Sequence, residues 1–375
     1  MKRKRSEAVN PEMLVLARQA RGLSQKELAQ LLSVSPGWLS KVEAGLREIS
    51  QEQLVKAARI LDYPVSFFSN KQRLYGPGIS EMFHRRRYRA SVKVIDRNQA
   101  QMEIRRINLA SLLNGVDIGE VEVPNYDLYD FDGRVQDIAR AVRAEWQLPS
   151  GPIANVVGII EEARGIVIPI DFEGKLVDAT SYWPRNMPPL FFIDLNHPTD
   201  RIRFSLCHEL GHIVMHQDNP NPFMEKQANE FAAEFLMPKE DIKPYLTDLS
   251  LEKLATLKPY WRTSMAALLH RARDLNAISE RRHKTLWIEM GKAGYRMREP
   301  VELDIPSEKP SLMEEIIGIY SNEMEYSVSD LAKLFRLHEH EVCHIYFGAA
   351  LKNRHEDVQA AIREAETILK QYRQR

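Results

Sequence analysis

The chain has few cysteines, no net charge and no long apolar run. Its two cysteines, Cys207 and Cys343, lie far apart in 375 residues, which excludes a disulfide framework and fits a reducing compartment. Lys and Arg number 52, as do Asp and Glu, so attraction to nucleic acid has to come from local regions. No apolar run approaches the roughly 18 residues of a membrane span, and the start lacks the apolar stretch of a signal peptide. These absences predict a cytoplasmic protein that does not bind membranes, with two or three domains.

The most informative segment that is present is His208-Glu209-Leu210-Gly211-His212. Residues four apart on a helix share a face, about 5–6 Å apart between Cβ atoms. Two neutral imidazoles at this spacing can bind one zinc ion, and a carboxylate beside them can take a proton from water. We therefore expect His208 and His212 as zinc ligands and Glu209 as the catalytic base. The alternative is a core helix with two hydrogen-bonded histidines, but it leaves the carboxylate unpaired in an apolar stretch.

A zinc site of this kind needs a third protein ligand. His216 lies two turns beyond His208, about 12 Å along a helix axis, so one ion cannot bind both of them together with His212. We expect His216 at the end of the helix, where it complements the helix dipole. The loop that follows is rich in turn formers, and we expect Asn221 to cap a second helix that begins at Pro222.

Glu225 is the better candidate for the third ligand. It lies near the start of the second helix, which we expect to end before Pro238. At about 100° per residue, Glu225 shares a face with Asn229 and two alanines, whereas Glu230 and Glu234 point elsewhere. Asn229 would hydrogen-bond a ligand histidine and fix its tautomer. The alternative for Glu225 is a first-turn carboxylate that complements the helix dipole.

Residues 203–212 and 225–238 together resemble the ImmA/IrrE metallo-endopeptidases. In that family two histidines and a glutamate of the second helix bind zinc, and the glutamate between the histidines is the general base. The resemblance implies the same roles for the four residues named above, and it extends over about residues 135–300. Cys207 departs from the family pattern, which has a small apolar residue there, but a buried free cysteine behaves as one.

The segment around these motifs predicts a zincin-like α+β domain. We expect a small mixed sheet packed on the zinc helix, and an edge strand that could pair with an extended substrate peptide. Tyr260 and His270 are candidate oxyanion stabilisers; the alternatives are a packed aromatic ring and a surface histidine. The expected strands cover residues 165–170, 177–183 and 190–195, and the expected helices cover residues 135–146 and 153–163.

The N-terminal segment predicts a helix-turn-helix. Ser24 and Glu27 form a capping box at the start of one short helix, and Ser35 caps a second helix that ends at Gly45. Helices over residues 11–21 and 50–61 would complete an all-α bundle. Residues 13–68 resemble the Xre/lambda-repressor-type DNA-binding domains.

That resemblance implies a particular way of binding double-stranded DNA. The second helix of the motif enters the major groove with its N-terminal residues toward the bases, here Pro36, Gly37, Trp38 and Lys41. Gln25, at the start of the first helix, is expected on a phosphate. Proline and glycine offer no side-chain donor, so base readout rests on few groups, and Trp38 could equally belong to the core.

The charge of this N-terminal segment has the sign that phosphate attraction requires. Up to Asp62 the chain holds eleven Lys and Arg against seven Asp and Glu, a net charge of +4. Four of the eleven form the tail Lys2–Arg5, which is either a flexible arm on DNA or a solubilising tail.

Three further segments have open roles. Residues 92–113 predict a long helix, either a dimer spacer or a strut on the peptidase, preceded by the basic stretch His84–Arg89. Residues 326–335 and 338–347 look like a degenerate helix-turn-helix that lacks basic side chains, which we interpret as structural or regulatory.

Together these patterns predict a multidomain α+β protein. The expected segments are a helix-turn-helix domain (1–70), a linker with the long helix (71–132), a peptidase domain (133–280) and a helical C-terminal region (281–375). The expected function is a homodimeric DNA-binding regulator whose zinc peptidase cleaves a repressor-type protein in phage, mobile-element or stress control. The alternative is a DNA-binding regulator whose zinc domain is a non-catalytic sensor or interaction module.

Overall fold

The computed structural model describes residues 8–72, 74, 91–174, 177–217, 221–348 and 367–368. The tail Lys2–Arg5, the linker marked by Tyr75–Gly78 and the basic stretch His84–Arg89 lie outside these residues. Within the described part of the chain, no helix is both long and apolar enough to cross a bilayer. The residues form two compact units, which are described one at a time below.

The boundaries of the two compact units differ from those of the four segments expected above. The four-segment division stays a prediction. The first unit comprises residues 1–77, 89–118 and 313–375, and the second comprises residues 78–88 and 119–312. The expected C-terminal region is thus shared between the two units.

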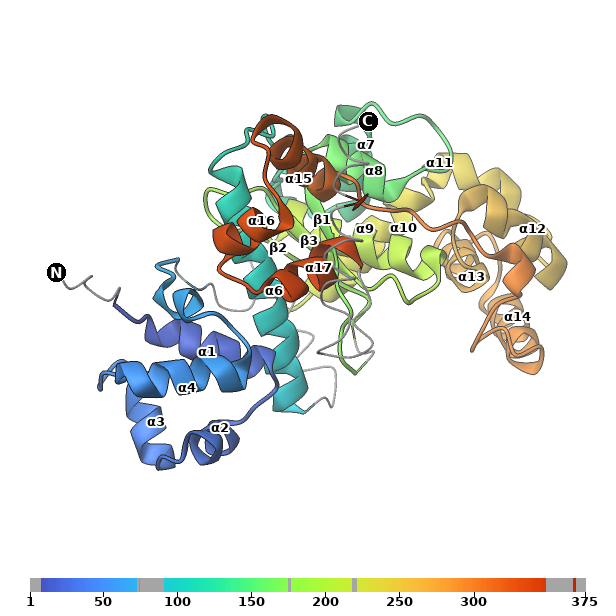
Figure 1. The fold of residues 1–375 in the computed structure, drawn as a ribbon. Helices are drawn as coiled ribbons and strands as arrows, with labels where there is room; N and C mark the ends of the chain where they lie inside the picture. Colours follow the sequence, from blue (N-terminus) through green and yellow to red (C-terminus); the bar gives the residue numbers. More distant parts are fainter. Residues whose placement is uncertain are drawn as a thin grey trace. The chain divides into compact units, whose positions relative to one another are not determined.

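The first unit contains the expected helix-turn-helix (Figure 1). Ser24 Oγ accepts a hydrogen bond of 3.2 Å from the amide of Glu27, whose carboxylate accepts one of 2.6 Å from the amide of Ser24, so the capping box is confirmed. Ser33 makes the turn in the left-handed region at φ 61°, and Ser35 caps the second helix. The elements of this bundle are α1 (Pro11–Ala20), α2 (Gln25–Leu32), α3 (Pro36–Glu43), α4 (Gln51–Leu61) and η1 (Val65–Ser69).

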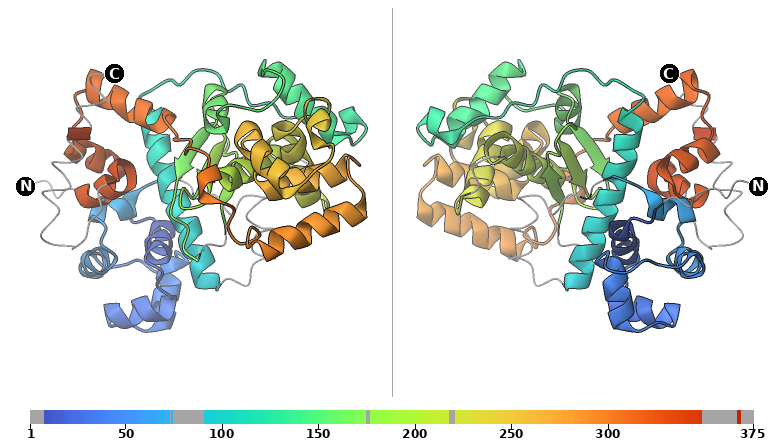
Figure 2. Two further views of the ribbon diagram at one scale, coloured as in Figure 1. Left: turned by 90° about the vertical axis from the view of Figure 1, so that its right-hand side faces the viewer. Right: turned by 90° about the vertical axis from the view of Figure 1, so that its left-hand side faces the viewer.

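The long helix α6 (Val92–Leu113) belongs to this first unit, where it packs on α1 and α16 (Figure 2). Its expected role as a dimer spacer or as a strut on the peptidase stays a prediction. The C-terminal helices α15 (Leu312–Glu323), α16 (Val328–Phe335) and α17 (Glu339–Phe347) complete the unit. Arg336, at φ 56°, joins α16 to α17 just as Ser33 joins α2 to α3. Glu341 of α17 is paired with Arg21 at the end of α1, which supports the structural interpretation of this motif.

The second unit is built on a small mixed sheet, as the sequence predicts. Its strands are β1 (Ile166–Pro169), β2 (Ala179–Tyr182) and β3 (Leu190–Ile193), in the order β1-β3-β2. β1 runs parallel to β3 and β2 runs antiparallel to it, with Ser181 opposite Phe191. The short apolar runs of β1 and β3 are buried, and β2 lies at an edge of this sheet.

Helix α9 (Thr199–Met215), which carries the histidine motif, packs against the sheet and against α10 (Met224–Leu236). A Cβ atom on Gly211 would lie 3.1–3.2 Å from the ring and Cβ of Phe231, so the glycine allows the two helices to approach closely. The other elements are η2 (Leu128–Phe131), α7 (Val135–Glu145), α8 (Val156–Glu162), α11 (Lys239–Ile242), η3 (Lys243–Leu246), α12 (Leu251–Trp261), α13 (Met265–Asp274), α14 (Glu280–Lys292) and η4 (Val301–Leu303).

The start of α10 corrects one expectation. The helix begins at Met224, after Phe223 as N-cap, and not at Pro222 with Asn221 as its cap. The Asn221 carboxamide instead accepts a hydrogen bond of 2.9 Å from the Phe223 amide. Asn221 is therefore an Asx-type turn residue ahead of the helix, an alternative that asparagine side chains offer to the backbone.

The segment that follows α14 crosses back over the second unit and contributes buried carboxylates. Glu308 is ion-paired with the buried Arg203 of α9 and accepts hydrogen bonds from the amides of Val156 and Val157 at the start of α8. These contacts link α8 and α9 through one carboxylate more than a hundred residues further along the chain.

Candidate metal centre and DNA-binding face

Three side chains from α9 and α10 converge in the second unit. The Nε2 atoms of His208 and His212 lie 3.1 Å apart, and the Glu225 carboxylate lies 3.3 Å from Nε2 of His212 and 3.8 Å from Nε2 of His208. The imidazoles are buried and the carboxylate is about a quarter exposed, at 27%. The structure therefore brings together the three residues that the sequence proposes as metal ligands.

The hydrogen bonds of His208 leave the lone pair of its Nε2 atom available to bind a metal ion. Asn229 gives its amide group to the backbone carbonyl of Glu225 at 2.7 Å, so its carboxamide oxygen faces Nδ1 of His208 at 3.1 Å. Nδ1 must then carry the proton, which leaves Nε2 unprotonated. Burial, and secondarily the neighbouring His212, lowers the pKa of His208 to about 4, so the ring is neutral at pH 7.

This donor set fits a zinc ion. Two imidazole nitrogens and one carboxylate, with a further position left for water or substrate, are a ligand set found in catalytic zinc sites. Bond lengths of about 2.0–2.2 Å in a tetrahedral arrangement place ligand atoms about 3.3 Å apart. The separations of 3.1 and 3.3 Å are close to this value, and that of 3.8 Å exceeds it by half an ångström.

Glu209 lies on α9 next to His208 and is almost fully buried. The hydroxyl of Ser181, from the edge strand β2, donates a hydrogen bond of 2.7 Å to Oε2 of Glu209. The burial places the carboxylate in a low-dielectric environment, and the hydrogen bond holds its orientation. The sequence analysis did not identify Ser181, which lies between Thr180 and Tyr182 in a largely buried strand, because nothing in that local pattern points to Glu209.

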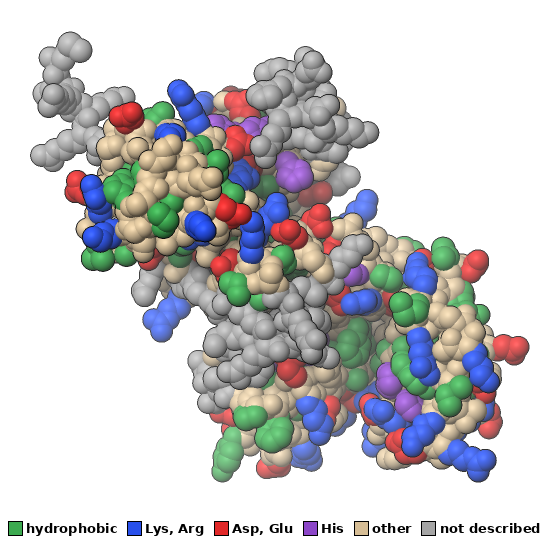
Figure 3. Space-filling view, turned by 90° about the horizontal axis from the view of Figure 1, so that it is seen from below, with side chains coloured by type: hydrophobic (Ala, Val, Ile, Leu, Met, Phe, Trp, Pro, Cys, Tyr) green, Lys and Arg blue, Asp and Glu red, His purple; other side chains and the backbone are tan. Residues whose placement is uncertain are grey.

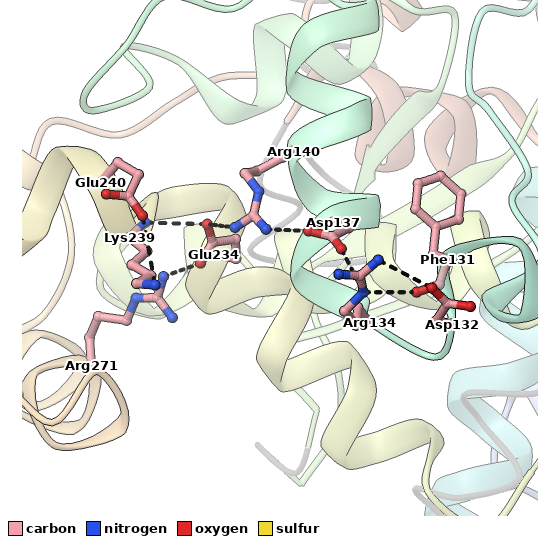
Figure 4. Close-up of polar contacts among 9 residues, drawn as sticks. All are labelled: Phe131, Asp132, Arg134, Asp137, Arg140, Glu234, Lys239, Glu240 and Arg271. Carbon is pink, nitrogen blue, oxygen red and sulfur yellow. Dashed lines mark hydrogen bonds and ion pairs between the residues drawn. The ribbon is translucent and has the colours of Figure 1, made fainter.

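The other two glutamates of α10 point away from this centre, as the helical periodicity predicts. Glu234 is buried and bound by Arg140 of α7 and Arg271 of α13 (Figure 4). Glu230 lies within 3.5 Å of Lys226 and accepts a hydrogen bond from Gln136. Glu234 therefore serves to join three helices.

His216 is the C-cap of α9 and is fully buried. Its Nδ1 atom lies 3.1 Å from Nδ1 of His212, and its Nε2 atom lies 3.1 Å from the side-chain oxygen of Gln227. Burial, and then the neighbouring His212, lowers the pKa of His216 to about 4. The expected charge complementarity to the helix dipole does not apply, because a neutral ring carries no charge.

Of the two candidate oxyanion stabilisers, one lines a cavity that the metal centre reaches through Glu225 and Asn229. This cavity has a volume of about 1840 Å³, and both Glu225 and His270 line it. Tyr260 is half exposed on α12, its ring packs near Tyr245 and Trp261, and it is absent from the cavity lining. Either role stays a prediction.

In the first unit, the residues expected at DNA lie at the start of α2 and along α3. Pro36, Gly37 and Lys41 are exposed, and Trp38 is half-buried with the Arg47 guanidinium 5.7 Å from its ring centroid. Gln25 donates a hydrogen bond of 2.9 Å to Glu43 at the end of α3, so its side chain also joins the two helices.

Glu43 is held further by Arg18 of α1 at 2.7 Å, which fixes α3 on the bundle. Figure 3 views the bundle from below, and its Lys and Arg side chains are scattered among acidic and apolar ones. This distribution fits the modest net charge of the segment.

Comparison with protein-family models gives two matches. A helix-turn-helix model matches residues 14–68, and the model of peptidase family M78, the IrrE N-terminal-like domain, matches residues 161–273. The chain joins a helix-turn-helix domain to an ImmA/IrrE-type domain. No curated protein matches the chain.

The matched part of the ImmA/IrrE-type domain contains the sheet, α9, α10, α12 and nearly all of α13. Two buried carboxylates that support it lie beyond the match: Glu308, described above, and Glu299, which pairs with Lys258 and caps the start of α13. The two matches support a DNA-binding regulator joined to a peptidase-like domain of a family that uses a metal.

Proposed function

We propose that the chain is a cytoplasmic, homodimeric DNA-binding regulator with a zinc-dependent endopeptidase activity that cleaves a repressor-type protein. The observation that carries this proposal is the convergence of His208, His212 and Glu225 beside the buried Glu209. Such a set combines three neutral or anionic ligands with a carboxylate placed for general-base chemistry.

The metal would be held by Nε2 of His208, Nε2 of His212 and the Glu225 carboxylate. When bound, zinc supplies a Lewis acid that polarises the carbonyl of a peptide bond. Glu209 accepts a proton from the attacking water and then donates it to the leaving amine. The hydroxyl of Ser181 keeps the Glu209 carboxylate oriented during both transfers.

The substrate is proposed to be a protein segment because of the space and the strand beside the centre. A cavity of about 1840 Å³ exceeds the roughly 300–1,000 Å³ of pockets for small molecules. β2 lies at the edge of the sheet order β1-β3-β2 and contributes Ser181, so an extended peptide paired with β2 would pass close to Glu209.

The proposal is tested by cleavage. Purified protein is incubated with repressor-type proteins encoded beside its gene, with and without a chelator, and fragments are identified by mass spectrometry. We expect cleavage that requires zinc and is absent for Glu209→Gln. Cleavage that persists in Glu209→Gln would contradict the proposed chemistry.

The second candidate function is a DNA-binding regulator whose zinc domain senses or binds without cutting. It uses the same metal centre and omits turnover, since the family match gives a metallopeptidase-type domain and no catalytic activity. It predicts zinc-dependent DNA affinity and intact candidate repressors.

A further inference from the structure

The buried His216 and its half-buried partner Gln227 have no role in the chemistry described so far. His216 is fully buried at the C-terminal end of α9. Its ring bridges His212 on its own helix and Gln227 on α10, with both nitrogen contacts at 3.1 Å. In a neutral imidazole one ring nitrogen donates a hydrogen bond and the other accepts one. The partner of one nitrogen therefore determines whether the other nitrogen donates or accepts.

Gln227 ends a series of three hydrogen-bonded side chains, His212, His216 and Gln227, and it determines where the protons of the two imidazoles lie. The side-chain oxygen of Gln227 can only accept, so Nε2 of His216 carries a proton and donates it. Nδ1 of the neutral His216 is then an acceptor, and Nδ1 of His212 must donate to it. His212 is left with an unprotonated Nε2, the atom that faces His208 and Glu225.

The opposite direction of these hydrogen bonds would prevent His212 from binding a metal ion. If the carboxamide of Gln227 donated to His216, then His216 would donate to His212, and Nε2 of His212 would be protonated. A protonated Nε2 cannot bind a metal. The orientation of one carboxamide thus selects between a tautomer of His212 that binds metal and one that does not.

We infer that His216 and Gln227 are positioning residues that act as a two-step hydrogen-bond relay to fix His212 in its metal-binding tautomer. The inference rests on the proposed zinc site. The tautomers of the two ligand histidines are then fixed in different ways. Asn229 fixes His208 directly, and His212 is fixed through the second imidazole of His216. Asn229 and Gln227 both lie on α10, which also supplies Glu225. One helix therefore provides a metal ligand and the two carboxamides that fix the histidine tautomers.

Zinc affinity of the full-length chain tests the relay. Hydrogen-bond partners of metal-bound histidines typically contribute 10- to 100-fold to metal affinity. We expect Gln227→Leu and His216→Phe to weaken zinc binding at least about tenfold, measured by competition with a chromophoric chelator. Gln227→Glu keeps an acceptor at the end of the relay and should stay within about threefold of the wild type, because its carboxylate can only accept.

A matched control is His283→Asn, which removes a buried histidine of α14 whose ring contacts His270 and Trp287. It should leave zinc affinity unchanged. Wild-type affinity in both Gln227→Leu and His216→Phe overturns the relay, and so does equal weakening by Gln227→Leu and Gln227→Glu. A wild-type chain that binds no zinc at all instead overturns the proposed function.

Nitrogen NMR of histidine-labelled, metal-free protein provides a readout that does not depend on loading or on the variants folding. We expect His212 as the Nδ1–H tautomer and His216 as the Nε2–H tautomer. The reverse assignment of either ring contradicts the relay.

Discussion

The hydroxyl of Ser181 on the edge strand β2 donates a hydrogen bond of 2.7 Å to the carboxylate of Glu209 on helix α9. The bond connects the sheet to the residue proposed as the general base. Hydrogen bonds to charged groups contribute about 1.5–3 kcal/mol. Ser181→Ala should therefore lower the rate of cleavage about 10- to 100-fold without loss of zinc. A variant that cuts at the wild-type rate would show that the hydroxyl does not position the base.

Glu209→Gln separates metal binding from chemistry. The amide keeps the size of the side chain but cannot accept a proton from water. We expect full zinc content and no detectable cleavage of a substrate that the wild type cuts, measured by elemental analysis and gel electrophoresis on the same preparation. Loss of zinc in this variant would assign Glu209 to the metal instead.

The buried pair of Arg203 and Glu308 predicts that the domain depends on residues beyond the family match. Arg203→Met leaves a buried carboxylate without its partner, which costs about 3–5 kcal/mol. Chemical denaturation followed by circular dichroism would measure this loss. Arg201→Met, on the same helix, breaks a pair with Asp178 whose arginine is 57% exposed, and should cost about 1 kcal/mol or less. Equal losses in the two variants would contradict the stabilising role of the buried Arg203–Glu308 pair.

The N-terminal bundle should bind duplex DNA with an affinity that falls as salt rises. Lys41 is exposed on α3, and Lys41→Ala should weaken binding, whereas Lys284→Ala removes the same charge from α14 and should not. Glu209→Gln should leave DNA affinity unchanged. Fluorescence titration across a salt series measures these affinities, and sedimentation tests the expected dimer. A DNA affinity that changes neither with salt nor in Lys41→Ala would contradict the DNA-binding role and favour a protein-docking role for the bundle.

Much of the fold follows from local patterns. The capping box at Ser24, the positions of the short strands along the chain and the different directions of Glu225 and Glu234 on α10 are each set by a pattern within one short segment, where spacing determines geometry. The same locality explains why His208 and His212 could be paired from the sequence alone.

What the sequence does not predict depends on contacts between distant segments. Nothing in the spacing brings Ser181 to Glu209, or Glu308 to Arg203. His216 was assigned to a helix end because periodicity gives its position along the axis but not its burial against Gln227. The start of α10 differed because Asn221 satisfies a turn amide before the helix begins.

Zinc content of the purified chain tests the central claim that α9 and α10 together form a zinc site. The wild type should hold about one zinc per chain, and His208→Ala, His212→Ala and Glu225→Ala should each lose most of it, because three protein ligands define the site. Glu230→Ala, five residues along the same helix as Glu225 and outside the centre, should keep it. Elemental mass spectrometry of these five proteins after dialysis measures the difference. Full zinc in Glu225→Ala, or loss in Glu230→Ala, would contradict the ligand set.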